Sequence, residues 1–475
     1  MKVLIVASEA IPFIKTGGLA DVAGALPKEL HKLGAEVAVM LPLHSKIKHK
    51  YKDDLQFIAS ATIKLGWREK YLGVMKIESS GIPFYFIDCD DYFGDETYRG
   101  GDAENEQYLY FCRAVLAAIP MTGFVPDVIH CNDWHTGMIP MLLRTQYSGT
   151  ELDSVHSVIT IHNINFQGKM DFQMMQDILD IDAKYNGPGG VEAGGCANML
   201  KAGLVFADKI TTVSSTYARE ILTPWFGMGL EGTLKAREHD LCGILNGLDY
   251  EDFDPMTDKA LIKNYDSETI TAKRDNKKEL RSRFGLVGNL YDPVMCMVTR
   301  LTSQKGLDLV RHVLEELLKE NMHFVLLGSG DAEYEDFFRY IAEKYPGKAG
   351  VHLGYDEELA RIIYAGTDFL LMPSQFEPCG LSQMIAQRYG ALPIVRETGG
   401  LADTVTSWNE FNREGNGFSF WAYNAHDMMH AIRYALSVYR DKPALRQLRK
   451  NAMLLDNSFL ASAKKYMELY SEVIG

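Results

Sequence analysis

Short apolar runs alternate with amphipathic segments along most of the chain. The first run, residues 2–7 (KVLIVA), is almost wholly apolar, as expected for a parallel strand that is covered on both faces. Similar runs predict strands at residues 36–41, 157–163, 209–214, 241–249 and 293–301, and helical spacing predicts helices at residues 107–119, near 196–206 and in three segments over 425–474. Strand and helix alternate in both halves, which predicts an α/β protein with two doubly wound domains.

Three parts of the chain interrupt this alternation. Residues 55–88 contain strand-like runs with alternating polar and apolar positions, which indicate antiparallel additions to the first sheet. Residues 88–101 form a loop rich in acids, aromatics and glycine, and residues 168–190 end in glycines and are a candidate mobile loop. The aromatic residues of the first loop are candidates for binding an acceptor: Tyr92, Phe93 and Tyr98.

The length of 475 residues exceeds what one hydrophobic core normally supports. We place the hinge between the two domains in the polar, acidic stretch DYEDFDP at residues 249–255. The predicted division is a first domain over residues 1–248, a second domain over residues 249–455, and a C-terminal helix over residues 456–475 that returns to the first domain.

The composition and the net charge argue against several classes of protein. A hydrophobic content of 47% with 24% charged residues is ordinary for a globular protein, and the net charge of −14 argues against binding to nucleic acid or to anionic membranes. The N-terminus makes a poor signal peptide, and no apolar run is long enough to span a membrane. Seven scattered cysteines without ligand spacing suggest reduced thiols, so we expect a cytoplasmic protein.

The most informative stretch is residues 370–383 (LLMPSQFEPCGLSQ). An apolar strand ends at Pro373, a loop carries the single charge of Glu377, and a helix is predicted to begin at Gly380. A helix N-terminus suits a phosphate, which a carboxylate would repel, so Glu377 is better placed to bind a neutral sugar hydroxyl beside it. The alternative is that Glu377 only caps the helix or faces solvent.

Two cations follow the strand at residues 293–301. Arg300 lies at its carboxyl end and Lys305 begins the next helix, so the two could clamp a diphosphate, although a surface pair is the alternative. Gly328 lies in a Gly-Ser-Gly turn. This turn is expected near the nucleotide, although a purely structural role for the glycine is the alternative. Tyr355 could stack on a base or fill the core.

The first strand leads into Lys15-Thr16-Gly17-Gly18, at the usual position of a phosphate cradle. Paired glycines allow the backbone to approach a ligand closely, and Lys15 could supply a countercharge. The hexapeptide TGGLAD occurs at residues 16–21 and again at 398–403, which suggests that the two turns meet comparable backbone demands.

Two further segments carry polar residues at strand ends. The strand at residues 157–163 ends in His162-Asn163, and His162 could contact a reacting sugar, although local hydrogen bonds are the commoner role of such a histidine. Asp133 opens the sequence Asp-Trp-His after another strand. Because no acidic cluster or histidine pair accompanies a phosphate site, we propose neither a metal nor a cofactor.

Several motifs in order resemble the bacterial glycogen synthase and plant starch synthase family. They are KTGGLADV at residues 15–22, TRLTSQKG at 299–306, and EPCGLSQM at 377–384 followed by ETGGLADTV at 397–405. The resemblance covers essentially the whole chain. It implies the GT-B fold, two Rossmann-like domains facing across a deep cleft, and metal-independent transfer of glucose from ADP-glucose to the non-reducing end of an α-1,4-glucan (glycogen or a maltooligosaccharide) with retention of configuration.

The resemblance also implies roles for individual residues. Arg300 and Lys305 hold the diphosphate, Glu377 binds the glucose hydroxyls, and His162 lies close to the anomeric centre. The other residues expected to bind substrate are Lys15, Gly17, Gly18, Asp21, Asp133, Asn163, Asn246, Gly328, Tyr355, Cys379, Gly380, Leu381 and Ser382.

Other classes of protein fit less well. A glycogen phosphorylase would be far longer and would carry a lysine-bound pyridoxal phosphate. A sucrose- or trehalose-type synthase would share the Arg/Lys/Glu pattern but not KTGGLADV, and a non-catalytic glucan-binding protein would have little use for that pattern. The sequence does not decide between ADP-glucose and UDP-glucose, and it leaves the oligomeric state open.

Overall fold

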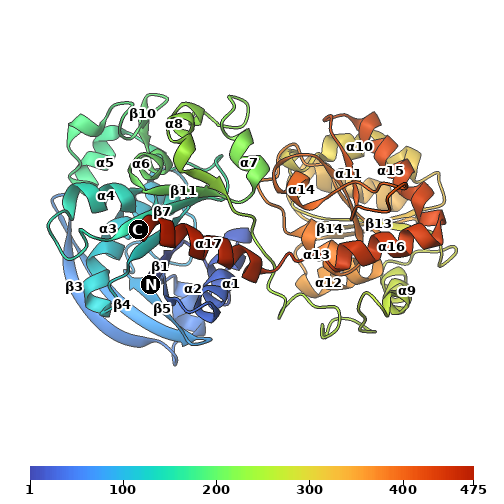
Figure 1. Cartoon of the computed structure of the whole chain (residues 1–475), viewed down its shortest axis with the longest axis horizontal. Helices are drawn as coiled ribbons and strands as arrows, with labels where there is room; N and C mark the ends of the chain where they lie inside the picture. The colour runs from blue at the N-terminus through green and yellow to red at the C-terminus, as the bar shows by residue number, and fades with distance from the viewer. The chain divides into compact units, whose positions relative to one another are not determined.

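A computed structural model describes the whole chain, residues 1–475, which folds as two compact units (Figure 1). The first unit comprises Met1–Gly247 and Phe459–Gly475, and the second comprises Leu248–Ser458. Each unit has its own mainly parallel sheet with helices around it, which confirms the predicted α/β class with two doubly wound sheets.

The first unit is built on a nine-stranded sheet in the order β12-β11-β7-β6-β1-β2-β5-β4-β3. The pairs β3–β4 and β4–β5 are antiparallel, as predicted, and the other pairs are parallel. The strands are β1 (Lys2–Val6), β2 (Glu36–Pro42), β3 (Gln56–Leu65), β4 (Arg68–Ser79), β5 (Ile82–Asp88), β6 (Val128–Asn132), β7 (His156–Ile161), β11 (Lys209–Thr212) and β12 (Leu241–Gly243).

Helices and one small sheet cover this sheet. The helices are α1 (Gly18–Lys32), α2 (Ser45–Lys50), α3 (Gly101–Thr122), α4 (Met138–Gln146), α5 (Phe172–Leu179), α6 (Met199–Phe206), α7 (Ser215–Glu220), α8 (Glu231–Ala236) and α17 (Phe459–Ile474). The small sheet joins β8 (Lys169–Met170), β10 (Cys196–Asn198) and β9 (Glu192–Ala193). Helix α17, at the C-terminus, packs beside α1, and the Tyr470 hydroxyl lies 2.7 Å from Nδ1 of His130.

The second unit has a six-stranded, wholly parallel sheet in the order β15-β14-β13-β16-β17-β18. Its strands are β13 (Val294–Val298), β14 (His323–Gly328), β15 (Ala349–Leu353), β16 (Phe369–Met372), β17 (Leu392–Arg396) and β18 (Phe418–Phe420). Its helices are α9 (Lys273–Arg283), α10 (Leu307–Leu317), α11 (Ala332–Lys344), α12 (Glu357–Gly366), α13 (Ser382–Arg388), α14 (Gly399–Thr404), α15 (Ala425–Arg440) and α16 (Lys442–Met453).

Some predicted boundaries were wrong. Helix α13 begins at Ser382 rather than at Gly380, because Gly380 has a φ of +74° that a right-handed helix does not accept. Strand β12 ends at Gly243 rather than at residue 249, since the chain then leaves the sheet edge for the second unit. Residues 168–190, predicted to be a loop, contain α5, whose apolar face is buried.

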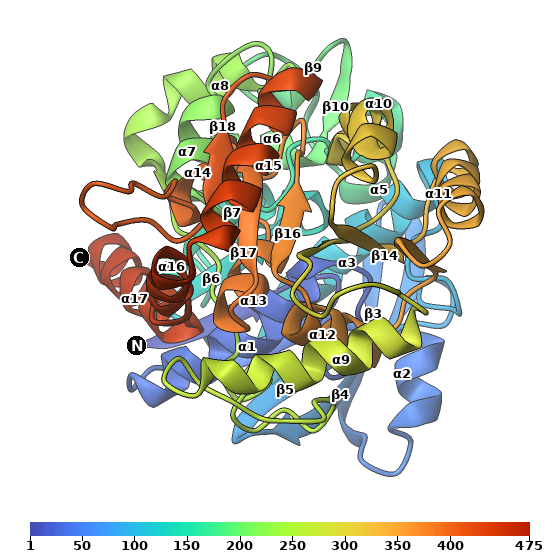
Figure 2. The same ribbon diagram turned by 90° about the vertical axis from the view of Figure 1, so that its right-hand side faces the viewer.

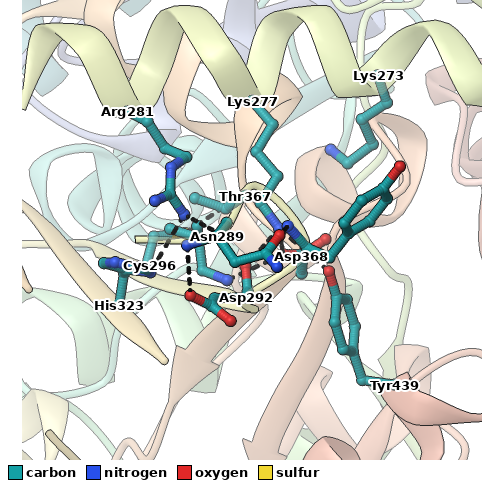
Figure 3. Close-up of polar contacts among 12 residues, drawn as sticks. Lys273, Lys277, Arg281, Asn289, Asp292, Cys296, His323, Thr367, Asp368 and Tyr439 are labelled. Atoms are coloured by element: carbon teal, nitrogen blue, oxygen red, sulfur yellow. Dashed lines mark hydrogen bonds and ion pairs between the residues drawn. The ribbon is translucent and has the colours of Figure 1, made fainter. Parts of the chain in front are cut away.

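Helix α9 was not predicted, because its sequence KRDNKKELRSR is almost entirely polar. It packs beside α12 (Figure 2). Figure 3 shows Lys273, Lys277 and Arg281 pointing from one face of α9 toward the amino ends of the strands. At this edge Asp368, which precedes β16, accepts 2.6 Å bonds from both Lys277 Nζ and the Arg449 guanidinium. Buried ion pairs therefore fasten α9 to the sheet.

Candidate active site

The carboxyl edge of the second unit's sheet holds the central ion pair of the candidate site. Glu377 follows β16 and Lys305 follows the adjacent strand β13. Lys305 Nζ donates to Glu377 Oε2 at 2.6 Å, and the buried Ser374 hydroxyl donates to the same oxygen at 3.0 Å. Glu377 is only 8% exposed, so its carboxylate is neither a solvent-facing charge nor a simple helix cap.

Close packing of two loops holds this pair together. Gly306 has a φ of +69°, and a Cβ at this position would lie 2.0 Å from the Pro373 carbonyl oxygen. Gln304 joins the same loops, because its carbonyl accepts from the Gln375 amide at 2.8 Å and its side chain donates to the Phe376 carbonyl at 3.1 Å. A glycine after Lys305 is therefore needed to bring the ammonium group to Glu377.

The second TGGLAD sequence supports the Glu377 loop from the other side. The Gly400 amide lies 3.1 Å from the carbonyl oxygens of both Glu377 and Pro378. A Cβ on Gly400 would lie 2.0 Å from the Cys379 carbonyl oxygen, and one on Gly399 would lie 2.0 Å from the Glu377 carbonyl oxygen. Both copies of TGGLAD open a helix after a strand, α1 and α14, and here the glycines allow backbone to touch backbone.

We expect Gly400→Ala to lower kcat/KM by about 10- to 100-fold, because the new methyl group must displace the backbone that positions Glu377. Steady-state kinetics checks this. Gly232→Ala is the control, since nothing lies within 4 Å of its added Cβ, and it should leave kcat/KM unchanged. Wild-type kinetics in Gly400→Ala would show that the contact does not matter.

Further predicted residues lie along the same edge of this sheet. Arg300 follows β13 and is exposed, and its guanidinium makes no hydrogen bond or ion pair within the protein. Gly328 ends β14, where a Cβ would lie 1.9 Å from the Thr299 carbonyl oxygen, so this glycine serves the packing of the turn. Tyr355 follows β15 and is 77% exposed, so it does not fill the core.

The residues predicted around the helix N-terminus form a turn and the start of α13. Cys379 is buried, Gly380 turns the chain, and Leu381 precedes the helix that begins at Ser382. The first amides of any helix have no partner within it, so those of α13 are available to an anion. Geometry therefore brings Lys305 and Glu377 into direct contact and places Arg300 and α13 on the same sheet edge.

Two residues of this region were not predicted. Ser374 bonds Glu377 directly, and Arg396 donates to the Gln375 carbonyl at 2.7 Å and so fixes the loop before Glu377. The only signal for Arg396 in the sequence is its position at the end of the apolar run that forms β17. Arg300 has a similar position after β13.

In the first unit, the KTGG loop is organised by Glu9, which sequence reasoning also missed. The buried carboxylate of Glu9 accepts from the Thr16 amide and hydroxyl, both at 2.6 Å, and from the Gly17 amide at 3.1 Å. Burial raises the pKa of Glu9, while the bonds from Thr16 oppose this. Lys15 Nζ lies 2.6 Å from Asp21 Oδ1, and the Gly18 amide has no partner in the protein.

Asp133 organises a second loop of this unit. Its Oδ1 accepts from the backbone amide of His162 at 2.7 Å and from that of Asn163 at 3.3 Å. Asp133 has φ 58° and ψ −177°, a conformation that strains any residue other than glycine and is typical of functional sites. Burial raises the pKa of Asp133 to about 7, although the two amides favour its charged form.

The predicted residues of this unit thus fall into contacting groups. His162, Asn163 and Asp133 contact one another, and Lys15, Gly17, Gly18 and Asp21 share the start of α1. Asn246 follows β12, and its buried Oδ1 has no hydrogen-bond partner, so it can accept from a ligand. No three His, Cys, Asp or Glu residues are grouped so as to hold a metal ion, and no helix is long and apolar enough to cross a bilayer.

Comparison with known proteins identifies the family. Residues 2–236 match the family model described as the starch synthase catalytic domain, and residues 279–454 match that of group 1 glycosyl transferases. A glycogen synthase of Geobacillus thermodenitrificans is 50% identical over all of this chain and 98% of its own length. The chain belongs to the glycogen synthase and starch synthase family. It is a glycosyltransferase, and the resemblance carried by its motifs is confirmed.

Solved structures agree with this assignment. The catalytic domain of starch synthase IV from Arabidopsis thaliana, bound to ADP and acarbose, is 32% identical with a TM-score of 0.91 and covers 99% of both chains. Sucrose-phosphate synthase from Thermosynechococcus elongatus, at 17% identity and a TM-score of 0.63, covers 99% of this chain and 98% of its own. Together they establish the GT-B fold of this family member.

Proposed function

We propose that this glycosyltransferase transfers glucose from ADP-glucose to the non-reducing end of an α-1,4-glucan, with retention of configuration and without a metal ion. The observation that carries the proposal is the Lys305–Glu377 pair, 2.6 Å long, at the sheet edge where Arg300 also follows its strand. The similarity of the chain supports the same proposal, because it is 50% identical to a glycogen synthase and 32% identical to a starch synthase whose structure was solved with ADP.

The chemistry explains the choice of residues. Breaking a glycosyl–phosphate bond places negative charge on the departing nucleoside diphosphate and positive charge on the sugar ring. The cations of Arg300 and Lys305 and the free amides of α13 can stabilise the first charge. A neutralised diphosphate leaves without protonation by a carboxylic acid, so the paired carboxylates of glycosidases are not required.

Glu377 is proposed to bind the hexose rather than to attack it. Its Oε2 already accepts from Lys305 and Ser374, which disperses the negative charge that a nucleophile needs. We propose instead that the acceptor hydroxyl gives its proton to the departing phosphate on the same face of the sugar, which preserves the configuration. A covalent intermediate trapped on Glu377 would overturn this step.

The other site residues keep the roles that the family resemblance implies, as proposals. Lys15 and Gly18 bind phosphate, Asp21 and Asn246 line the donor pocket, and His162 contacts the sugar. The unpartnered Oδ1 of Asn246 and the free Gly18 amide support two of these roles. The cytoplasmic location stays a prediction from the sequence.

We expect initial rates of radiolabel transfer to glycogen to be at least about 10-fold higher from ADP-glucose than from UDP-glucose at equal concentration, a difference of only about 1.4 kcal/mol in transition-state binding. Adding EDTA should leave the rate unchanged. Transfer from neither nucleotide sugar would refute the proposed function, a preference for UDP-glucose would refute the donor, and loss of activity in EDTA would refute metal independence.

A further inference from the structure

Asn132 is the last residue of β6, and its buried side-chain amide takes part in three hydrogen bonds. It is 1% exposed, and its Nδ2 donates to the carbonyl oxygens of Val6 and His130, each at 3.1 Å. Its Oδ1 lies 2.9 Å from Nε2 of His162, which follows the neighbouring strand β7. Two carbonyls on one side can be bonded only by the NH₂ group, so this network fixes the orientation of the amide.

The orientation of the amide determines the tautomer of His162. An amide oxygen only accepts, so Nε2 of His162 must carry the hydrogen. Burial lowers the pKa of His162 to about 3, so the imidazole is neutral near pH 7 and has one N–H group. Nδ1 is therefore an unprotonated acceptor, and it makes no hydrogen bond within the protein.

The surroundings hold the ring in this arrangement. The backbone amide of His162 is bonded to Asp133, which fixes the main chain at the end of β7. The neighbouring imidazole of His130 is engaged elsewhere, with Thr160 at 2.6 Å and Tyr470 at 2.7 Å. Asn132 is thus the group that binds the His162 ring itself.

We propose that Asn132 is a positioning residue that holds His162 in the Nε2–H tautomer, so that Nδ1 accepts a hydrogen bond from a hydroxyl group of the sugar substrate. The inference rests on the proposed function for the identity of the substrate, but the tautomer is a property of the free protein. An imidazole with its hydrogen on Nδ1 would instead donate, and it would meet the hydroxyl oxygen rather than its hydrogen.

Nitrogen NMR of the free protein labelled with ¹⁵N-histidine tests the tautomer directly. His162 is assigned by the signals missing in His162→Gln. We expect a pyrrole-type shift for Nε2 and a pyridine-type shift for Nδ1, unchanged between pH 6 and 8. The opposite pattern, or a protonated ring, would overturn the inference whether or not the protein transfers glucose.

Two variants test the part played by Asn132. Asn132→Leu removes the acceptor, so the His162 shifts should move toward a mixture of tautomers and kcat/KM for the nucleotide sugar should fall about 10-fold, the value of one hydrogen bond to a buried group. Asn132→Asp keeps an oxygen facing Nε2, and in its neutral form the carboxyl O–H can still donate to one of the two carbonyl oxygens that Nδ2 bonds, so it should preserve the tautomer and recover most of the rate.

A matched control separates positioning from stability. Asn276 is another buried asparagine, 2% exposed, whose Nδ2 donates to the Lys263 carbonyl at 2.7 Å, far along the chain in the second unit. Asn276→Leu should lower the melting temperature comparably but leave the His162 shifts and kcat/KM unchanged. Unchanged His162 shifts and an unchanged rate in Asn132→Leu would overturn the role of Asn132. If that variant does not fold, the His162 shifts of the wild type and of Asn132→Asp decide whether Asn132 sets the tautomer.

Discussion

Lys305→Met is expected to lower kcat by about 100- to 1,000-fold, the usual cost of removing one group that stabilises developing negative charge. The ammonium group is held 2.6 Å from Glu377 by the packing of Gly306 on Pro373, so its position is fixed before substrate binds. An interaction realised mainly in the transition state affects kcat more than KM. Steady-state kinetics with varied nucleotide sugar measures both.

The control for this variant is another lysine in an ion pair of the same length. Lys344 Nζ lies 2.6 Å from Glu315 on the surface of the second unit. Lys344→Met should leave kcat unchanged, because the pair is exposed and remote from the sheet edge that carries Glu377. If Lys305→Met also kept the wild-type kcat, the proposed stabilisation of the leaving group would be wrong.

Asp368→Asn is expected to destabilise the second unit by about 3–5 kcal/mol, the usual cost of leaving buried charges without their partner. Asp368 is 3% exposed and is bonded by Lys277, Arg449 and the Val294 amide. Asparagine has the same shape but no charge, so it would leave the two cations uncompensated. Differential scanning calorimetry should show the transition of this unit lowered by roughly 10 °C.

The stabilising effect of Asp368 on the second unit is expected to decrease at low pH. Burial alone would raise the pKa of Asp368, but the Lys277 ammonium and the Arg449 guanidinium overcome it and lower the pKa from 3.8 to about 2. A carboxyl whose pKa is lower in the folded state stabilises the protein above its unfolded pKa and loses this effect as the pH falls through its folded pKa. The difference between wild type and Asp368→Asn should be constant from pH 5 to 7 and shrink by roughly 2 kcal/mol between pH 4 and 2.

A half-buried acid near the surface of the same unit provides the control. Glu320 pairs with Arg433 at 3.1 Å on the surface, and Glu320→Gln should change the stability by less than about 1 kcal/mol. A transition in Asp368→Asn no lower than that in Glu320→Gln would show that the ion pairs do not fasten α9 to the sheet.

Much of the candidate site could be predicted because its residues follow apolar strands. Arg300 and His162 come at the end of such a run and Glu377 lies in the loop after one, and parallel strands end at one edge of a sheet. The partners of these residues were harder to predict. Ser374, Arg396 and Glu9 carry no motif of their own, and their roles depend on hydrogen bonds that the loops make only when folded. The partner lies 3 residues away for Ser374, 7 for Glu9 and 21 for Arg396, and no hydrophobic pattern marks such pairs.

The sequence by itself determined the α/β class, the alternation of strand and helix in both halves and the positions of Lys305 and Glu377 after two of the strands, because hydrophobic periodicity is a local property of the chain. That these two strands, β13 and β16, are neighbours in the sheet was decided by the tertiary structure. Only the tertiary structure decided that α9 is a helix with one buried face. Three of the five buried residues on this face are cations, which a sequence pattern assigns to solvent. Lys277 is buried because Asp368, 91 residues further along, compensates its charge, and no local pattern contains that pairing.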